Sequence, residues 1–212
     1  MTLVCLDLEG VLLPEIWIAF AESVGIPEFR RTTRDEPDYD KLMRFRIDLL
    51  GRHKFRLSDI QRAAGNIEPL PGAVEFCAKL RELTQLVILS DTFEQFARPV
   101  MAKLNYPTLF CNSLITSEDG AVTGYRLRQT DGKKHAVIAF KSMNLNVFAA
   151  GDSFNDLNMI SEADEGCLFR APERIRRDYP GIPRADSLDE LLGRIEDFLR
   201  REQEITAFSG SA

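Results

Sequence analysis

The chain has 212 residues, 44% of them hydrophobic and 28% charged, which is typical of a folded globular protein and unlike a disordered or fibrous one. Its formal net charge of −6 argues against broad binding to nucleic acid or to an anionic membrane surface, because both require a positive footprint. The four cysteines lie far apart among apolar neighbours, without the paired spacing of a zinc site. We therefore expect buried free thiols and a reducing, cytoplasmic location.

The first predicted element is a short buried strand, Leu3–Leu6, which stops at Asp7. Residues 1–13 are apolar, but Asp7 and Glu9 interrupt them and no basic leader precedes them, which indicates neither a signal peptide nor a membrane span. From about residue 15 to 68, apolar side chains recur at helical spacing without an intervening strand. This pattern predicts a helical insertion, and the Pro- and Gly-containing segment 68–72 predicts a hinge after it.

Strands and helices alternate through the rest of the chain. Buried strands are predicted at 86–89, 109–110, 147–150 and 167–169, and helices at about 93–104 and 133–143. This alternation predicts an α/β fold, with a doubly wound, Rossmann-like parallel sheet and helices on both faces. Between residues 114 and 128, the dipeptide Asp119-Gly120 lies between β-type residues and predicts a β-hairpin.

Three parts of the chain are expected from these patterns. Residues 1–14 and 70–205 would form the catalytic core, and residues 15–69 a small helical cap inserted after the first strand. Residues 206–212 end in small side chains and would form a flexible tail.

Polar residues follow three of the predicted strands. Asp7 and Glu9 follow the first, Ser90 and Asp91 the second, and Asp152 the strand at 147–150. In an open parallel sheet, reactive groups collect in the crevice at the carboxyl ends of the strands. A single acid in such a position is often only a helix cap or a turn residue. The convergence of several predicts a reactive site.

Four motifs, in this order, resemble the haloacid dehalogenase superfamily: Asp7-Leu8-Glu9-Gly10-Val11, Ser90, a lysine at 133 or 134, and Gly151-Asp152-Ser153-Phe154-Asn155-Asp156. The resemblance implies a Mg²⁺-dependent phosphomonoesterase in which Asp7 attacks phosphorus and Glu9 transfers protons. It also implies that Asp7, the Glu9 carbonyl and Asp152 hold the ion, with Asp156 supporting them. Ser90 and Lys133, which we favour over Lys134, would contact the phosphate.

Two residues depart from the usual form of the first motif. Glu9 stands where most members have aspartate, and Val11 replaces a threonine or serine. Glutamate adds a methylene, so proton transfer requires a shift of the backbone or of the substrate to absorb the extra length. The alternative is that Glu9 is a strand-end carboxylate without a role in proton transfer.

The placing of the insertion and the segment Leu70-Pro71-Gly72 resemble the phosphoserine phosphatase group. That resemblance places Glu15 against the substrate ammonium and Arg46 against its carboxylate. It also places Asn155 near the phosphate and Asp91 near the carboxylate end. Alternatively, Glu15 is only an acid at a helix N-terminus and Arg46 a solvated cap residue.

The variant Asp7-x-Glu9-Gly-Val, with Ser90-Asp91-Thr92-Phe93, more narrowly resembles the bifunctional members of that group. This implies hydrolysis of O-phosphoserine and transfer of the phosphoryl group to homoserine, in serine and threonine biosynthesis. The expected partners are these small molecules, with no nucleic acid and no membrane, and a homodimer is left open. Two competing hypotheses are a phospho-aspartate signalling domain and a catalytically silent homologue that binds an amino acid.

Overall fold

A seven-stranded sheet forms the centre of the protein, in the order β4-β3-β2-β1-β5-β6-β7. The computed structural model describes residues 1–33, 35–36 and 38–209. The strands are β1 (Thr2–Leu6), β2 (Gln85–Phe93), β3 (Thr108–Thr116), β4 (Val122–Arg126), β5 (Asn146–Gly151), β6 (Glu165–Phe169) and β7 (Arg184–Ala185). Neighbouring strands run parallel except β3 and β4, which pair antiparallel. The predicted α/β fold and the predicted hairpin are both confirmed.

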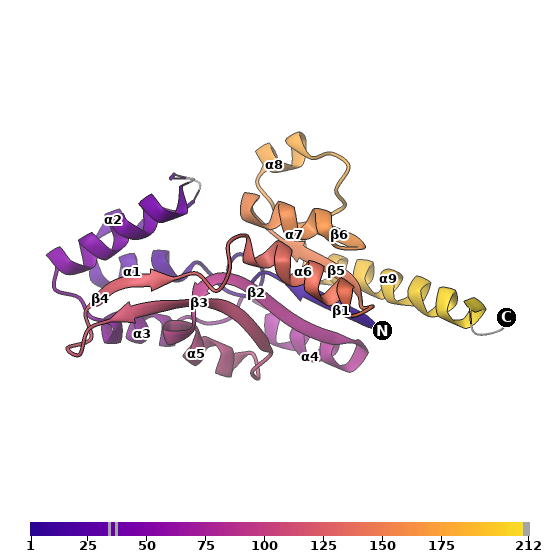
Figure 1. Cartoon of the computed structure of the whole chain (residues 1–212), viewed down its shortest axis with the longest axis horizontal. Coiled ribbons are helices and arrows are strands. Elements are labelled where there is room, and N and C mark those ends of the chain that lie inside the picture. Colours follow the sequence, from indigo (N-terminus) through magenta and orange to yellow (C-terminus); the bar gives the residue numbers. More distant parts are fainter. Residues whose placement is uncertain (34, 37, 210–212) are drawn as a thin grey trace.

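Helices cover both faces of the sheet (Figure 1). In β1, Val4 and Leu6 pack into one apolar cluster with α4 (Ala73–Leu83) and α9 (Leu188–Ser209). Leu3 and Cys5 point to the opposite face and pack with α6 (Gly132–Ser142) and α7 (Leu157–Glu162). Successive side chains of a strand alternate between faces, and both faces are buried here. This is why the strands read as continuous apolar runs in the sequence.

The insertion between β1 and α4 is helical, as predicted. It contains α1 (Ile16–Val24), the 3-10 helix η1 (Pro27–Arg30), α2 (Tyr39–Arg52) and α3 (Leu57–Gly65). Its interior is aromatic: the rings of Phe20 and Phe29 lie 4.9 Å apart, and Trp17 stacks on Phe29 at 6.1 Å. In Figure 1 these helices and the β3–β4 hairpin occupy one end of the molecule, and both termini lie at the other. We call residues 15–69 the cap.

The remaining helices connect strands of the core. Helix α5 (Glu94–Lys103) follows β2 and contacts α3 of the cap, and the short α8 (Glu173–Asp178) follows β6. A 3-10 helix, η2 (Phe154–Asp156), separates β5 from α7. Across the described residues, no helix combines the length and the hydropathy that crossing a membrane requires.

The structure corrects three details of the sequence prediction. The strand expected at 109–110 and the first arm of the hairpin form one continuous strand, β3, which pairs with β2 and β4 in turn. Cys111 on β3 is only partly buried, whereas the other three cysteines are buried free thiols as expected. Helix α9 continues to Ser209, so the first part of the expected tail is helical. Residues 210–212 lie outside the described residues.

Candidate active site

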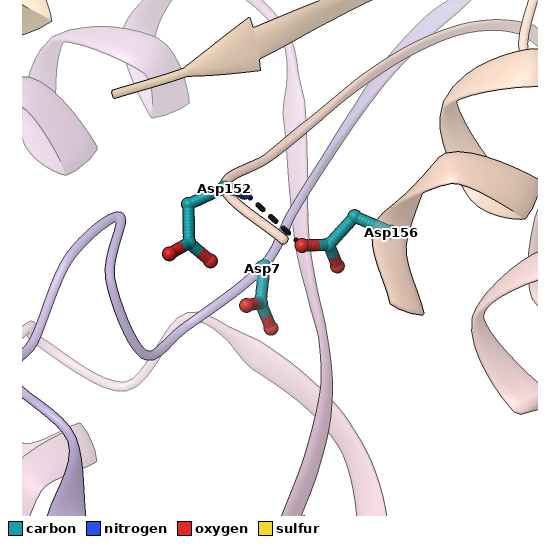
Figure 2. A group of neighbouring side chains, drawn as sticks. All are labelled: Asp7, Asp152 and Asp156. Carbon is teal, nitrogen blue, oxygen red and sulfur yellow. Dashed lines mark hydrogen bonds between the residues drawn. The ribbon is translucent and has the colours of Figure 1, made fainter. Parts of the chain in front are cut away.

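The carboxylate of Asp7 lies buried directly after β1 (Figure 2). The ammonium of Lys133 lies beside it. The Asp7 amide donates to the carbonyl of Ala150 on β5 at 3.0 Å, which extends the β1–β5 pairing to this residue. Lys133, in the first turn of α6, places Nζ 2.8 Å from Asp7 Oδ1 and 2.7 Å from Asp156 Oδ1. Lys134, by contrast, is partly exposed. Of the two lysines that the sequence offered, Lys133 is the one whose ammonium lies beside Asp7.

Asp156 organises the loop that follows β5. Its Oδ2 accepts hydrogen bonds at 3.0 Å from the amides of Asp152 and Ser153 and from the Ser153 hydroxyl. A Cβ at Gly151 would lie 2.2 Å from the Asp156 carboxyl carbon, so the side chain packs where only glycine leaves room. Both oxygens of Asp156 are thus engaged by protein donors. This carboxylate contacts the Asp152 amide and the Lys133 ammonium.

Three carboxylates meet at this edge of the sheet: Asp7, Asp152 and Asp156 offer oxygens that all lie within 4.8 Å of one another (Figure 2). Gly10, at φ +84°, makes room for them, because a Cβ there would lie 2.5 Å from the Asp152 carboxylate. The Asp152 carboxylate therefore lies against the main chain beside Glu9. Carboxylate and carbonyl oxygens are the donors that Mg²⁺ prefers, so these residues fit such an ion.

Charge at this cluster is unbalanced. Burial raises the pKa of Asp7 well above its usual value, Asp156 raises it further, Lys133 opposes the rise, and Asp152 adds to it. Burial alone would lower the pKa of Lys133, but the charges of Asp156 and Asp7 outweigh burial and raise it. One lysine therefore faces three acids, and a bound cation would relieve the repulsion that remains.

Glu9 reaches from the loop after β1 to the start of α1. Its Oε2 accepts the Ile16 amide at 2.9 Å, one of the donors that a helix N-terminus leaves without an intrahelical partner. This contact takes up the extra methylene of glutamate. Burial raises the pKa of Glu9 to about 8, and the charge of Glu15 contributes in the same direction. A pKa raised towards neutral is what a group that gives and takes back a proton requires.

Arg46 and Glu15 line the same pocket as Asp7 and Glu9. Arg46, on α2, is 6% exposed, its Nη2 donates to the Arg31 carbonyl at 2.8 Å, and its Cζ lies 4.6 Å from the Trp17 ring centre. The alternative of a solvated arginine is therefore wrong. Burial lowers the pKa of Arg46 to about 10, and its Nε finds no hydrogen-bond partner among the described residues. A buried N–H of this kind is costly unless a ligand accepts from it.

Ser90, Asp91 and Asn155 complete the set that the sequence proposed. Ser90 is buried, and its Oγ accepts the Thr92 amide at 3.2 Å. Asn155 Nδ2 donates to Asp91 Oδ2 at 2.8 Å, which joins β2 to the segment after β5. All three line the pocket, so the structure brings every proposed residue together except Asp156, which lies beneath it.

Several residues that line the pocket were not predicted from the sequence, among them Trp17, Tyr39 and Thr92. Thr92 lies two residues after Ser90 on β2, and the period of a strand places both side chains on one face. Tyr39 lies seven residues before Arg46 on α2, a spacing that places them on one face of a helix. Both residues could have been found by extending those two patterns.

Residues 1–164 match the family model of the haloacid dehalogenase-like hydrolases. The chain belongs to this family. Among curated proteins, it is 54% identical over 187 residues to a phosphoserine phosphatase of Pseudomonas syringae pv. tomato, covering 88% of this chain and 79% of that protein. It is 52% identical over 191 residues to the phosphoserine phosphatase ThrH of Pseudomonas aeruginosa, covering 90% and 93% of the two chains.

Solved structures place this family member's fold among the phosphoserine phosphatases. A substrate-bound phosphoserine phosphatase complex superposes with a TM-score of 0.75 at 21% identity, covering 91% of this chain and 97% of the other. A phospho-aspartyl intermediate analogue of phosphoserine phosphatase gives the same TM-score and identity, covering 91% and 98%. At this level of identity the likeness concerns the fold alone.

Proposed function

We propose that this hydrolase is a Mg²⁺-dependent phosphoserine phosphatase that works through an aspartyl phosphate on Asp7. The proposed site lies between a core of residues 1–14 and 70–205 and the cap of residues 15–69. One observation carries the proposal: a single pocket is lined by Asp7, Lys133 and Asp152 and also by Glu15 and Arg46. The first group suits a phosphate ester, and the second suits the ammonium and carboxylate of an amino acid. The names of the relatives agree with this substrate.

The reaction begins at Asp7. Its carboxylate attacks phosphorus and the ester P–O bond breaks, while the Glu9 carboxyl gives its proton to the departing seryl oxygen. Water then attacks the aspartyl phosphate, Glu9 takes the proton from that water, and the P–O bond to Asp7 breaks. Asp7, Asp152 and the Glu9 carbonyl would hold Mg²⁺, which would supply the positive charge that lets two anions meet.

The other proposed contacts hold the substrate in place. Lys133 and Ser90 hold the phosphoryl oxygens, and Asn155, oriented by its hydrogen bond to Asp91, reaches the same group. Arg46 receives the substrate carboxylate, which also accepts from the unpartnered Nε. With Glu15 on the ammonium, both charged ends of phosphoserine are matched.

The same intermediate permits transfer to a second alcohol, and we propose homoserine as that acceptor. Hydrolysis and transfer share every step until water or alcohol attacks the aspartyl phosphate. Homoserine exceeds serine by one methylene, and a contact of that size discriminates by only about 1 kcal/mol. These activities would place the protein in serine and threonine biosynthesis in the cytoplasm, in keeping with its free cysteines.

The test is phosphate release from a panel of phosphomonoesters, with Mg²⁺ or with chelator, by the wild type and Asp7→Asn. We expect Mg²⁺-dependent turnover that favours O-phosphoserine and disappears in the variant. Homoserine added to the same reaction is expected to yield O-phosphohomoserine. Stable phosphorylation of Asp7 without turnover would favour the signalling hypothesis, and inertness towards every ester would favour the silent homologue.

A further inference from the structure

Tyr39 joins the cap to strand β2 of the core. It is the first residue of α2, and its hydroxyl donates to the main-chain carbonyl of Asp91 at 2.9 Å. That carbonyl also accepts from Asn112 Nδ2 at 3.2 Å. Asp91 follows Ser90 directly, and its side chain accepts from Asn155. One residue of the core therefore receives hydrogen bonds from the cap, from β3 and from the loop that carries Asp152.

This bond fixes the helix that carries Arg46. Tyr39 and Arg46 are separated by two turns of α2 and both line the pocket. The hydroxyl at the start of the helix is therefore one of the contacts that hold α2, and with it Arg46, against the strand of Ser90. Loss of this bond would weaken that contact beside Asp7, at a place where transfer to an alcohol requires water to be excluded.

A second hydroxyl links the cap and the core in a different environment. Tyr125, on β4 beside α2 (Figure 1), donates to Asp40 Oδ1 at 2.7 Å. The rings of Tyr125 and Tyr39 lie 5.8 Å apart in an edge-to-face contact. Asp40 is exposed, Tyr125 does not line the pocket, and this bond does not involve Ser90 or Asp91. The two tyrosines thus form a natural pair for comparison.

We propose that Tyr39 is a positioning residue that keeps the cap on the core while Asp7 carries the phosphoryl group, and so favours an alcohol over water as acceptor. The inference rests on the proposed function and extends it. At the branch, the hydroxyl oxygen of either acceptor attacks phosphorus, the P–O bond to Asp7 breaks, and the acceptor's proton passes to Glu9. Water yields inorganic phosphate, and the alcohol yields a new phosphate ester.

The experiment compares Tyr39→Phe with Tyr125→Phe, since each loses one hydroxyl and keeps its ring. Wild type and variants receive O-phosphoserine, Mg²⁺ and homoserine, and the ratio of O-phosphohomoserine to inorganic phosphate is measured. This ratio depends only on steps after the shared intermediate, so a general loss of folded enzyme does not change it. A partly buried hydrogen bond is expected to change it about fivefold. We expect Tyr39→Phe to lower the ratio by about that factor and Tyr125→Phe to leave it within about twofold of the wild type.

An unchanged ratio in Tyr39→Phe, or an equal fall in both variants, would overturn the role of this hydroxyl. A wild type that releases phosphate but never phosphorylates homoserine would contradict the proposed transfer. Amide hydrogen exchange then tests whether the Tyr39 hydroxyl holds α2 against the core. In the Mg²⁺-bound enzyme with phosphate, Tyr39→Phe should exchange the amides of α2 faster than Tyr125→Phe does. Equal exchange in the two variants would refute the role of the Tyr39 hydroxyl in holding α2.

Discussion

Replacing Lys133 by methionine removes the ammonium that lies between two buried carboxylates. Lys133 is 4% exposed and lies within 2.8 Å of both Asp7 and Asp156. Breaking a buried ion pair leaves an uncompensated charge, which typically costs about 3–5 kcal/mol. We expect Lys133→Met to lower the free energy of unfolding by about that amount in urea denaturation. Loss of one charged contact to the transferring group should reduce kcat by about 10²–10³-fold.

The pH dependence of this stability loss follows from the Asp7 carboxyl. Without the ammonium, burial and the neighbouring acids hold the folded-state pKa of Asp7 even further above its unfolded-state value. A carboxyl with a raised folded-state pKa weakens the folded state as pH rises from the unfolded pKa through the folded one. The loss of unfolding free energy in Lys133→Met should therefore be smallest at about pH 4 and grow towards neutral pH. If the cluster binds Mg²⁺ as proposed, the ion should recover part of this loss, because a ligand that binds the folded state stabilises it.

Lys134→Met is the matched control for that variant. Its side chain is partly exposed, so removal should change the unfolding free energy by no more than about 0.5 kcal/mol. Loss of activity in Lys134→Met with full activity in Lys133→Met would refute the reasoning. Equal stability of the two variants at neutral pH would also contradict it.

Two further variants test the metal cluster and the amino-acid end of the pocket. Gly10→Ala should lower the free energy of unfolding by about 1–2 kcal/mol, because an alanine is strained at a φ of +84°. It should also need more Mg²⁺ for half-maximal activity, because the new Cβ would lie 2.5 Å from the Asp152 carboxylate. Gly25→Ala, at φ +69° with no atom within 4 Å of the new Cβ, should show only the stability loss in thermal unfolding, and equal Mg²⁺ requirements would contradict the clash. Arg46→Lys should raise KM for O-phosphoserine at least about tenfold and spare an aryl phosphate without a carboxylate. Equal losses on both substrates would refute the carboxylate contact.

The fold could be predicted from the sequence because β1 and its neighbours are buried on both faces. Residues such as Val4 and Cys5 must then both be apolar, although they point in opposite directions. The convergence of Asp7 and Asp152 followed from the same topology, because parallel strands end at one edge. The continuity of β3 could not be predicted, since pairing with a second strand depends on contacts distant in sequence.

The details of the pocket depended on distances that local patterns do not contain. The burial of Arg46 results from its stacking on Trp17, which comes from another helix. Where the longer side chain of Glu9 reaches depends on the position of the Ile16 amide, which donates to its Oε2 and which the sequence does not give. The Tyr39 hydroxyl reaches a main-chain carbonyl, which every residue possesses, so no residue type marked the contact in advance.

The central claim is that Asp7 carries the phosphoryl group, and acid quenching tests it most directly. The enzyme is mixed with Mg²⁺ and O-phosphoserine labelled in the phosphate, stopped within one turnover, and its peptides are mapped. The account predicts label on Asp7 that hydroxylamine releases, as expected of an acyl phosphate, and none on Asp7→Asn. Label on another residue, or turnover of Asp7→Asn at the rate of the wild type, would contradict it.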